Sequence, residues 1–258
     1  LGKTTIILSL LKMLFMYRKT IGVLIIAPIR VMHLVWPLEI QKWANFDDLK
    51  INVMHGNKKD LWSNLDADIH IINPAGLPWL MKQLKGKRVN NWPFDMLVVD
   101  ESTMFKSYKS ARFKILRTYF VAKMKRRYIL TGTHIPNGYM QLFSQFQIVD
   151  EGFSLGTGIG QYRDLYFRLK PYTDPKHQQY ELLPGHGEKI NKRISRFVCR
   201  MSAEEYLKLP PITINKIYAE LPPKARKVYN ELEKEEFVVI DGKDVNPPNT
   251  PRLRKKLN

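Results

Sequence analysis

Two short segments, about 100 residues apart, carry side chains that could bind a nucleoside triphosphate. The first, Gly2-Lys3-Thr4-Thr5, matches the back half of a phosphate-binding loop, G-x-x-x-x-G-K-[ST]. In such a loop the glycine lets the backbone approach phosphate oxygens, the lysine places its charge on the β- and γ-phosphates, and the next hydroxyl ligates Mg²⁺. Gly-Lys-Thr alone is equally compatible with an ordinary helix start, so the rest of the sequence must supply a partner.

The partner is a pair of carboxylates, Asp100 and Glu101, that ends an apolar run. One carboxylate at a strand end can hold a Mg²⁺ ion, and its neighbour can orient or deprotonate the attacking water. Two solvated acids at a strand end are common, but in combination with Lys3 and Thr4 they favour a nucleotide site. We therefore expect a nucleoside triphosphate and Mg²⁺ as cofactors, with Thr4 and Asp100 as metal ligands and Gly2, Lys3, Thr4 and Thr5 as nucleotide-binding residues. The catalytic residues are then Lys3, Asp100 and Glu101.

A third candidate segment, Thr131-Gly132-Thr133, also follows an apolar run. Two hydroxyls around a glycine could sense the nucleotide through hydrogen bonds and pass its state to a neighbouring lobe. An ordinary transition from strand to turn explains the segment equally well.

Up to about residue 150, short apolar runs alternate with amphipathic stretches. This alternation predicts a parallel sheet covered on both faces, with ligands at the carboxyl ends of its strands. In residues 31–43, the apolar face of the expected helix consists of Val31, Leu34, Val35 and Leu38, and Trp43 could extend it. The expected strands are 22–28, 51–56, 68–74, 94–101 and 127–133, and the expected helices are 6–14, 31–43, 77–84, 111–121 and 141–149.

The pattern changes after residue 152, where glycines, a basic helix at 189–200 and paired prolines follow. Residues 212–221 alternate like a strand, and Pro222-Pro223 opens a helix that continues to Phe237. We therefore expect a nucleotide-binding lobe at 1–155, an α-rich extension at 156–211, and a connecting strand and helix at 212–258.

The charge balance points to a polyanionic partner. The 258 residues contain 42 Lys and Arg against 24 Asp and Glu, which gives a net charge of +18, and such an excess is typical of proteins that bind nucleic acid. The single cysteine, Cys199, excludes an internal disulfide and a cysteine-rich zinc site, which favours an intracellular, cytoplasmic location. No apolar stretch is long enough to cross a bilayer, so we expect no membrane partner.

In their joint order, these motifs resemble the first RecA-like lobe of Swi/Snf-type ATPases of helicase superfamily two, in the style of compact phage and prokaryotic members. The similarity extends over nearly the whole chain. It rests on Leu1-Gly2-Lys3-Thr4, Leu24–Pro28 with Trp36 and Lys42-Trp43, Asn73-Pro74, Val99–Ser102 with Lys106 and Ser110, Leu130–Thr133 with Pro136-Asn137, Leu209–Pro211, Leu221–Pro223 with Tyr229, and Arg252–Lys255.

The resemblance implies a RecA-like phosphate-loop fold with helices on both faces of a parallel sheet and an α-rich extension. It also implies a DNA-dependent ATPase that moves along double-stranded DNA, with Thr131, Gly132 and Thr133 coupling hydrolysis to DNA. Contacts would go mainly to the phosphate backbone, because a motor that moves along DNA cannot depend on base identity. The implied DNA-binding residues are Pro28, Arg30, Asn73, Lys106 and Lys109.

The sequence departs from the family pattern in three ways. Thr103 stands where many relatives carry histidine, and His134 stands where proline is usual. The front of the phosphate loop and the second lobe, which supplies arginine fingers in this family, have no counterpart here, so we expect the chain alone to hydrolyse little ATP. Two alternatives stay open: an RNA helicase or restriction-system motor subunit, and a non-catalytic basic DNA-binding module.

Overall fold

A parallel sheet of five strands, in the order β2-β3-β1-β4-β5, carries all the candidate motifs. The computed structural model describes residues 2–56, 60–132, 138–171, 178–201, 215, 220–235, 238–240 and 243–245. The strands are β1 (Val23–Ile26), β2 (Ile51–Met54), β3 (Ile69–Ile72), β4 (Met96–Val99) and β5 (Arg126–Ile129).

The five strands end in register. Ile26 pairs with both Ile72 and Val99, Met54 pairs with Ile72, and Val99 pairs with Ile129. Backbone hydrogen bonds continue one residue further, from the Asp100 N–H to the Ile26 carbonyl (2.8 Å) and from the Leu130 N–H to the Val99 carbonyl (2.8 Å). The residues after each strand therefore form a row along one edge, which we call the carboxyl edge.

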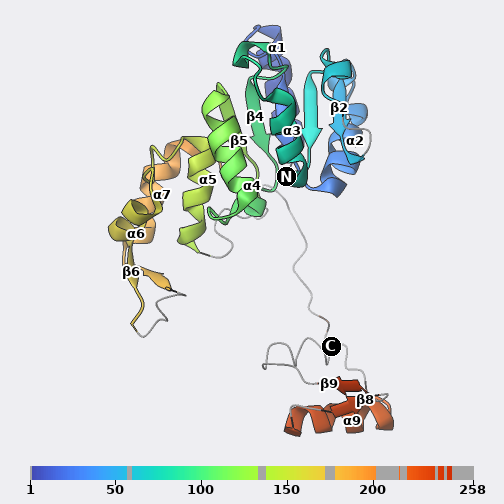
Figure 1. Cartoon of the computed structure of the whole chain (residues 1–258), viewed down its shortest axis with the longest axis vertical. Helices are drawn as coiled ribbons and strands as arrows, with labels where there is room; N and C mark the ends of the chain where they lie inside the picture. Colours follow the sequence, from blue (N-terminus) through green and yellow to red (C-terminus); the bar gives the residue numbers. More distant parts are fainter. Residues whose placement is uncertain are drawn as a thin grey trace. The chain divides into compact units, whose positions relative to one another are not determined.

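The three inner strands are buried on both faces, which explains their continuous apolar sequences. On one face, α1 (Lys3–Met16) and α2 (Trp36–Lys42) pack against the sheet. On the other lie α3 (Leu77–Leu84) and α4 (Ala111–Ile115) (Figure 1). The expected parallel sheet with helices on both faces is confirmed.

Short helical segments lie between or beside the helices and strands. Two are π-helical, η1 (Val31–Val35) and η8 (Leu116–Phe120). The others are 3₁₀-helical: η2 (Ala44–Phe46), η4 (Trp62–Asn64), η5 (Pro74–Gly76), η6 (Val89–Asn91), η7 (Ser102–Phe105), η9 (Val121–Lys123), η10 (Tyr139–Gln141) and η11 (Ser195–Phe197).

The expected helix at 31–43 exists, but its predicted apolar face is wrong. Leu34 and Leu38 are 58% and 57% exposed, whereas Met32, Trp36 and Ile40 are buried. The first turns are π-helical, with Pro37 in the first turn of the α-helix that follows. A π turn holds more residues than an α turn, so it displaces the residues that follow from a 3.6-residue pattern.

A third apolar cluster lies beside β5 and consists of α5 (Leu142–Val149), α6 (Ile159–Tyr166), α7 (His186–Ile194) and a hairpin of β6 (Phe167–Leu169) and β7 (Tyr180–Leu182). Tyr162 is buried within it, and its hydroxyl donates to the Tyr139 carbonyl (2.7 Å). The Arg127 side chain joins the cluster to the sheet by donating to the Val149 carbonyl (3.2 Å).

The chain divides into two compact units, Leu1–Ala203 and Glu204–Asn258. The second contains α9 (Pro223–Glu235) and an antiparallel pair, β8 (Val238–Ile240) and β9 (Lys243–Val245). The helix expected after Pro222-Pro223 is present, whereas most of the expected strand at 212–221 lies outside the described residues. The division into three parts with boundaries at 155 and 211 stays a prediction.

Burial of His70 in β3 predicts that acid destabilises the fold. The side chain is fully buried, with Nδ1 3.4 Å from the Asn52 amide nitrogen and the ring against Phe94. Burial lowers the pKa of His70 from 6.5 to about 4. The unfolded chain therefore binds the proton first, and stability that is complete above pH 6.5 is lost as pH falls toward 4. Between pH 8 and pH 5 we expect a loss of about 2 kcal/mol from this residue.

Urea unfolding of the wild type and His70→Leu at both pH values measures this loss, because groups that titrate in both proteins cancel in the comparison. His70→Leu should show the smaller pH dependence, whatever its stability at pH 8. His186→Gln, on α7, is the control, because it removes a histidine that lies outside the sheet. Equal pH dependence in the wild type and His70→Leu would contradict the assignment to His70.

Candidate nucleotide-binding site

The amino end of α1 has the geometry of an anion site. Gly2, at its N-cap, has φ +65°, a conformation that favours glycine, and a Cβ added there would meet nothing within 4 Å. The first hydrogen bond of the helix runs from the Ile6 N–H to the Gly2 carbonyl (3.0 Å). The N–H groups of the preceding helical residues consequently have no partner within the helix and can face an anion.

Asp100 lies one residue beyond the end of β4 and is only 8% exposed. Its Oδ2 accepts a hydrogen bond from the Trp36 indole (3.0 Å), and its Oδ1 accepts one from the Glu101 N–H (2.9 Å). Burial raises the pKa of Asp100, and the Trp36 hydrogen bond and the positive charge of Lys3 oppose that rise. The ammonium and the carboxylate, 97 positions apart in the sequence, are thus near enough for their charges to interact.

Glu101 has a left-handed backbone, with φ 54°, which is unusual for a residue other than glycine. Its carboxylate accepts a hydrogen bond from the Thr103 hydroxyl (2.8 Å). Strained backbone of this kind is concentrated at functional sites. Thr103, which the sequence marks only as a departure from the family pattern, therefore holds the expected water-activating carboxylate in place.

The acids follow β4, which lies between β1 and β5, so the segment after β5 is on the side of the acids opposite to β1. The Ser102 N–H donates to the Leu130 carbonyl (2.9 Å), which ties the residues after β4 to those after β5. Thr131 is half-buried and Gly132 is exposed beside this bond. Thr133 lies outside the described residues, so the coupling role of Thr131, Gly132 and Thr133 stays a prediction.

The expected DNA-binding residues all lie in segments that follow strands of the sheet. Arg30 is exposed after β1, and the Asn73 side chain accepts from the Gly76 N–H (3.1 Å), where it caps η5. Lys106 and Lys109 are exposed after η7, with the Lys109 ammonium 5.9 Å from the Tyr108 ring centre. Pro28 is half-buried two residues after β1. Pro28, Arg30 and Asn73 thus belong to the segments that follow β1 and β3, whereas Lys106 and Lys109 lie further along the chain, beyond η7, and the DNA-binding role of all five stays a prediction.

Two residues that sequence reasoning did not assign to the site contact it directly. Trp36 donates to Asp100, as described above, and the Glu39 carboxylate accepts from the Thr5 hydroxyl (2.9 Å). The sequence noted Trp36 only as part of a family motif. The contact of Glu39 with Thr5, over 34 positions, leaves no signal in residue type or spacing.

The residues present fit Mg²⁺ and a triphosphate. A hydroxyl and a carboxylate are the oxygen ligands that Mg²⁺ accepts, and Mg²⁺ usually keeps several waters besides one or two carboxylates and substrate phosphates. The open side of Gly2 and the free N–H groups of α1 suit phosphate oxygens. In the described part of the chain, no group of three or more His, Cys, Asp or Glu side chains could form a metal site of its own.

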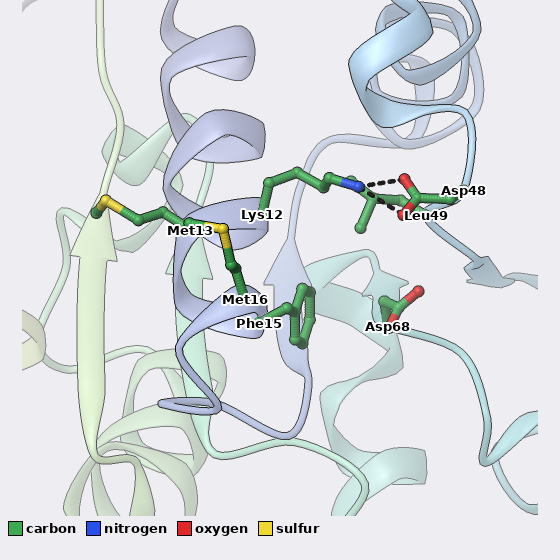
Figure 2. Close-up of a pocket in the computed structure, with 7 residues that line it drawn as sticks. All are labelled: Lys12, Met13, Phe15, Met16, Asp48, Leu49 and Asp68. Atoms are coloured by element: carbon green, nitrogen blue, oxygen red, sulfur yellow. Dashed lines mark hydrogen bonds and ion pairs between the residues drawn. The ribbon is translucent and has the colours of Figure 1, made fainter.

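A cavity of about 540 Å³ lies at the opposite end of α1, lined by Lys12, Met13, Phe15, Met16, Asp48, Leu49 and Asp68. Asp48 and Leu49 precede β2 and Asp68 precedes β3, so the cavity is at the amino edge of the sheet. Figure 2 shows Lys12 reaching the Asp48 carboxylate across it. It shares no residue with the candidate nucleotide site.

Comparison with known families decides the classification of the chain. The sequence profile of the SNF2-related domain matches residues 1–254. The chain belongs to the SNF2-related family. This confirms the resemblance to Swi/Snf-type proteins of helicase superfamily two that the ordered motifs predict.

The SNF2-related chain is 30% identical over 249 residues to protein p41 of Acyrthosiphon pisum secondary endosymbiont phage 1, covering 93% of this chain and 53% of that protein. It is 30% identical over 236 residues to an uncharacterized ATP-dependent helicase of Mycoplasma pneumoniae, covering 90% of this chain and 20% of that protein. It is 27% identical over 255 residues to helicase swr1 of Aspergillus fumigatus, covering 94% of this chain and 14% of that protein. The chain thus spans about half or less of these relatives.

A solved structure, the Sulfolobus solfataricus SWI2/SNF2 ATPase core in complex with dsDNA, has the same fold. The TM-score is 0.60 at 24% identity, over 90% of this SNF2-related chain and 45% of that chain. The predicted RecA-like fold is confirmed. Among the helices that the structure describes, none combines the length and the apolar character that a bilayer crossing requires. The cytoplasmic location stays a prediction.

Two buried aspartates at opposite ends of β4 give a matched test of the site. Asp95 precedes the strand, where it accepts hydrogen bonds from the Thr20 hydroxyl and the Ile21 N–H and pairs with Lys125 (2.9 Å). Burial alone would raise the pKa of Asp95, but these partners hold it below its ordinary value. Asp95 therefore stabilises the fold when ionised, whereas the raised pKa of Asp100 shows that its ionised form is costly to bury.

We expect Asp95→Asn to lower the free energy of unfolding by about 1–3 kcal/mol and Asp100→Asn to leave it unchanged or raise it, since function and stability conflict at such sites. Chemical unfolding of both variants at pH 7 makes the comparison. A loss in Asp100→Asn as large as that in Asp95→Asn would show that Asp100 is an ordinary structural carboxylate.

Proposed function

We propose that this chain is the ATP-binding lobe of a DNA-dependent ATPase that moves along double-stranded DNA. The reaction is hydrolysis of ATP to ADP and phosphate with Mg²⁺. Membership of the SNF2-related family supports the class of protein, since relatives include helicases and an ATPase core bound to dsDNA. The whole protein's activity is inferred, because the chain covers only part of each relative.

The observation that carries the proposal is the row of strand ends. Because β4 ends in register with β1 and β5, Asp100 and Glu101 lie at one edge between the residues of the other motifs. The first turn of α1 is linked to the same place through α2, because Thr5 donates to Glu39 and Trp36 donates to Asp100. A cation, a hydroxyl and two acids around one edge support phosphoryl chemistry.

Each residue then has a distinct task. The Lys3 ammonium and the N–H groups of α1 bind phosphate oxygens, while Thr4 and Asp100 hold the metal. Mg²⁺, when bound, neutralises negative charge that develops on the phosphate oxygens. The Glu101 carboxylate, fixed by Thr103, orients a water molecule and accepts its proton.

DNA would lie across the same edge and contact Arg30, Asn73, Lys106 and Lys109, with Pro28 shaping the surface between them. An exposed arginine and two exposed lysines suit the phosphate backbone, which supplies affinity without sequence preference. Thr131, Gly132 and Thr133 are the proposed route by which hydrolysis and DNA binding influence each other, since they follow β5 and the Leu130 carbonyl accepts from the Ser102 N–H beside the acids.

In the full-length protein, Lys3→Ala and Glu101→Gln should each lower DNA-stimulated ATP hydrolysis by about 100-fold or more, because each removes a group that acts on the reacting phosphate or water. Lys12→Ala is the matched control: it lies on the same helix, but its ammonium pairs with Asp48 at the amino edge. Phosphate release with duplex DNA, single-stranded DNA and RNA is the measurement. Stimulation by RNA alone would favour an RNA helicase, and unchanged rates in both variants would favour a non-catalytic DNA-binding module.

Arg30→Ala should weaken binding to duplex DNA of any sequence and flatten the slope of log affinity against log salt by about one, the value for one phosphate contact. Fluorescence anisotropy with labelled duplexes between 50 and about 200 mM salt covers the useful range. Lys50→Ala is the control, since Lys50 is exposed at the amino edge and pairs with Asp66. Equal slopes for both variants would place the DNA elsewhere.

A further inference from the structure

The helix α2 touches both halves of the candidate nucleotide site. From it, the Trp36 indole donates to Asp100 (3.0 Å) after β4, and Glu39 accepts from Thr5 (2.9 Å) in the first turn of α1. Residues three apart lie on the same side of a helix. One face of α2 therefore joins the segment expected to hold phosphates to the carboxylate expected to hold the metal.

Trp36 is a rigid hydrogen-bond donor. Its side chain is fully buried in the cluster that joins α1 and α2 to the sheet. A close-packed indole has little freedom to turn, so its N–H has a fixed direction. The other oxygen of Asp100 accepts from the Glu101 N–H, so donors on two sides fix the plane of the carboxylate. Such partners set the orientation of metal ligands.

Glu39 is a charged acceptor shared by two donors. Its Oε2 accepts from the Trp43 indole (3.1 Å) as well as from Thr5, and these two bonds hold the pKa of Glu39 below its ordinary value. The Thr5 hydroxyl is thereby directed at Glu39. Of the two adjacent threonines, Thr4 is therefore the one whose hydroxyl can bind a metal. The bond from Thr5 also anchors the first turn of α1 to α2.

The start of the same helical segment lies at the carboxyl edge. Arg30 is the N-cap of the π turn η1, and α2 follows that turn without a break. Single π turns inside helices occur frequently at functional sites. Here the turn places Trp36, rather than the exposed Leu34 and Val35, against Asp100.

We propose that Trp36 and Glu39 are positioning residues of the nucleotide site. Trp36 orients the Asp100 carboxylate toward the metal, and Glu39 fixes the phosphate-binding turn of α1 through Thr5. This inference rests on the proposed function, because it assumes that Mg²⁺ and ATP bind at this edge. Neither residue touches substrate, and each acts through its hydrogen-bonded partner.

The test measures binding rather than hydrolysis. Using the full-length protein and a fluorescent, non-hydrolysable ATP analogue, Mg²⁺ is titrated at fixed analogue concentration. Trp36→Phe keeps an aromatic ring but loses the N–H donor. Its half-saturating Mg²⁺ concentration should rise by about tenfold, which is the smaller end of the loss in metal affinity when a metal ligand loses its hydrogen-bonding partner. Affinity for the analogue in EDTA should not change. Glu39→Ala should instead weaken binding of the analogue both with and without Mg²⁺.

Trp62→Phe is the matched control, because its indole also donates to a side chain, that of Gln83 (3.2 Å), away from the site. It should behave as wild type. If the wild type itself shows no Mg²⁺-dependent binding, the proposed function fails. If the wild type binds and Trp36→Phe requires no more Mg²⁺ than it does, only the positioning role fails.

A measurement on the unaltered protein guards against a Trp36 variant that does not fold. The sequence has five tryptophans, and ¹⁵N-labelled indoles give one resonance each. Addition of Mg²⁺ to the analogue-bound protein should shift the Trp36 indole resonance and leave that of Trp62 in place. An unmoved Trp36 resonance, alongside Mg²⁺-dependent binding, would overturn the inference.

Discussion

The common end point of five parallel strands is the constraint on which the rest of the structure depends. Hydrogen bonds between β1, β3, β4 and β5 align their last residues and so place the segments that follow along one edge. Asp100 continues this ladder through its own N–H, which donates to the Ile26 carbonyl. The position of the carboxylate is therefore set by the sheet itself, and the apolar core on both faces keeps the sheet rigid.

Burial gives this edge its electrostatic character. Burial makes the ionised form of Asp100 unfavourable and raises its pKa. An indole N–H, a backbone N–H and the Lys3 ammonium partly offset this cost by stabilising the charge. The backbone of Glu101 is in the left-handed region, which is unfavourable for residues that carry a Cβ atom. Sites that bind charged ligands commonly retain such costly features, because the ligand compensates for them only when it is bound. Packing of α2 ties these features to the first turn of α1.

The sequence predicted the strands, most helices and the edge at which the motifs meet, because continuous apolar runs and helical spacing follow from burial. It was wrong about the apolar face of residues 31–43, since a π turn changes the spacing on which that prediction depends. It could not find the contacts of Trp36 with Asp100 and of Glu39 with Thr5, because they join residues 64 and 34 positions apart through tertiary packing alone. The sequence identified Thr103 as a departure from the family pattern. Its hydrogen bond to Glu101 could not be predicted, because the left-handed backbone of Glu101 has no signature in residue type.

The most direct test of the central claim is a crystal structure of the full-length protein with Mg²⁺ and a non-hydrolysable ATP analogue. We expect the metal between the Thr4 hydroxyl and the Asp100 carboxylate, with the β- and γ-phosphates at Lys3 and the first turn of α1. A nucleotide bound at the amino edge, for example in the cavity beside Lys12 and Asp48, or a metal remote from Asp100, would contradict it.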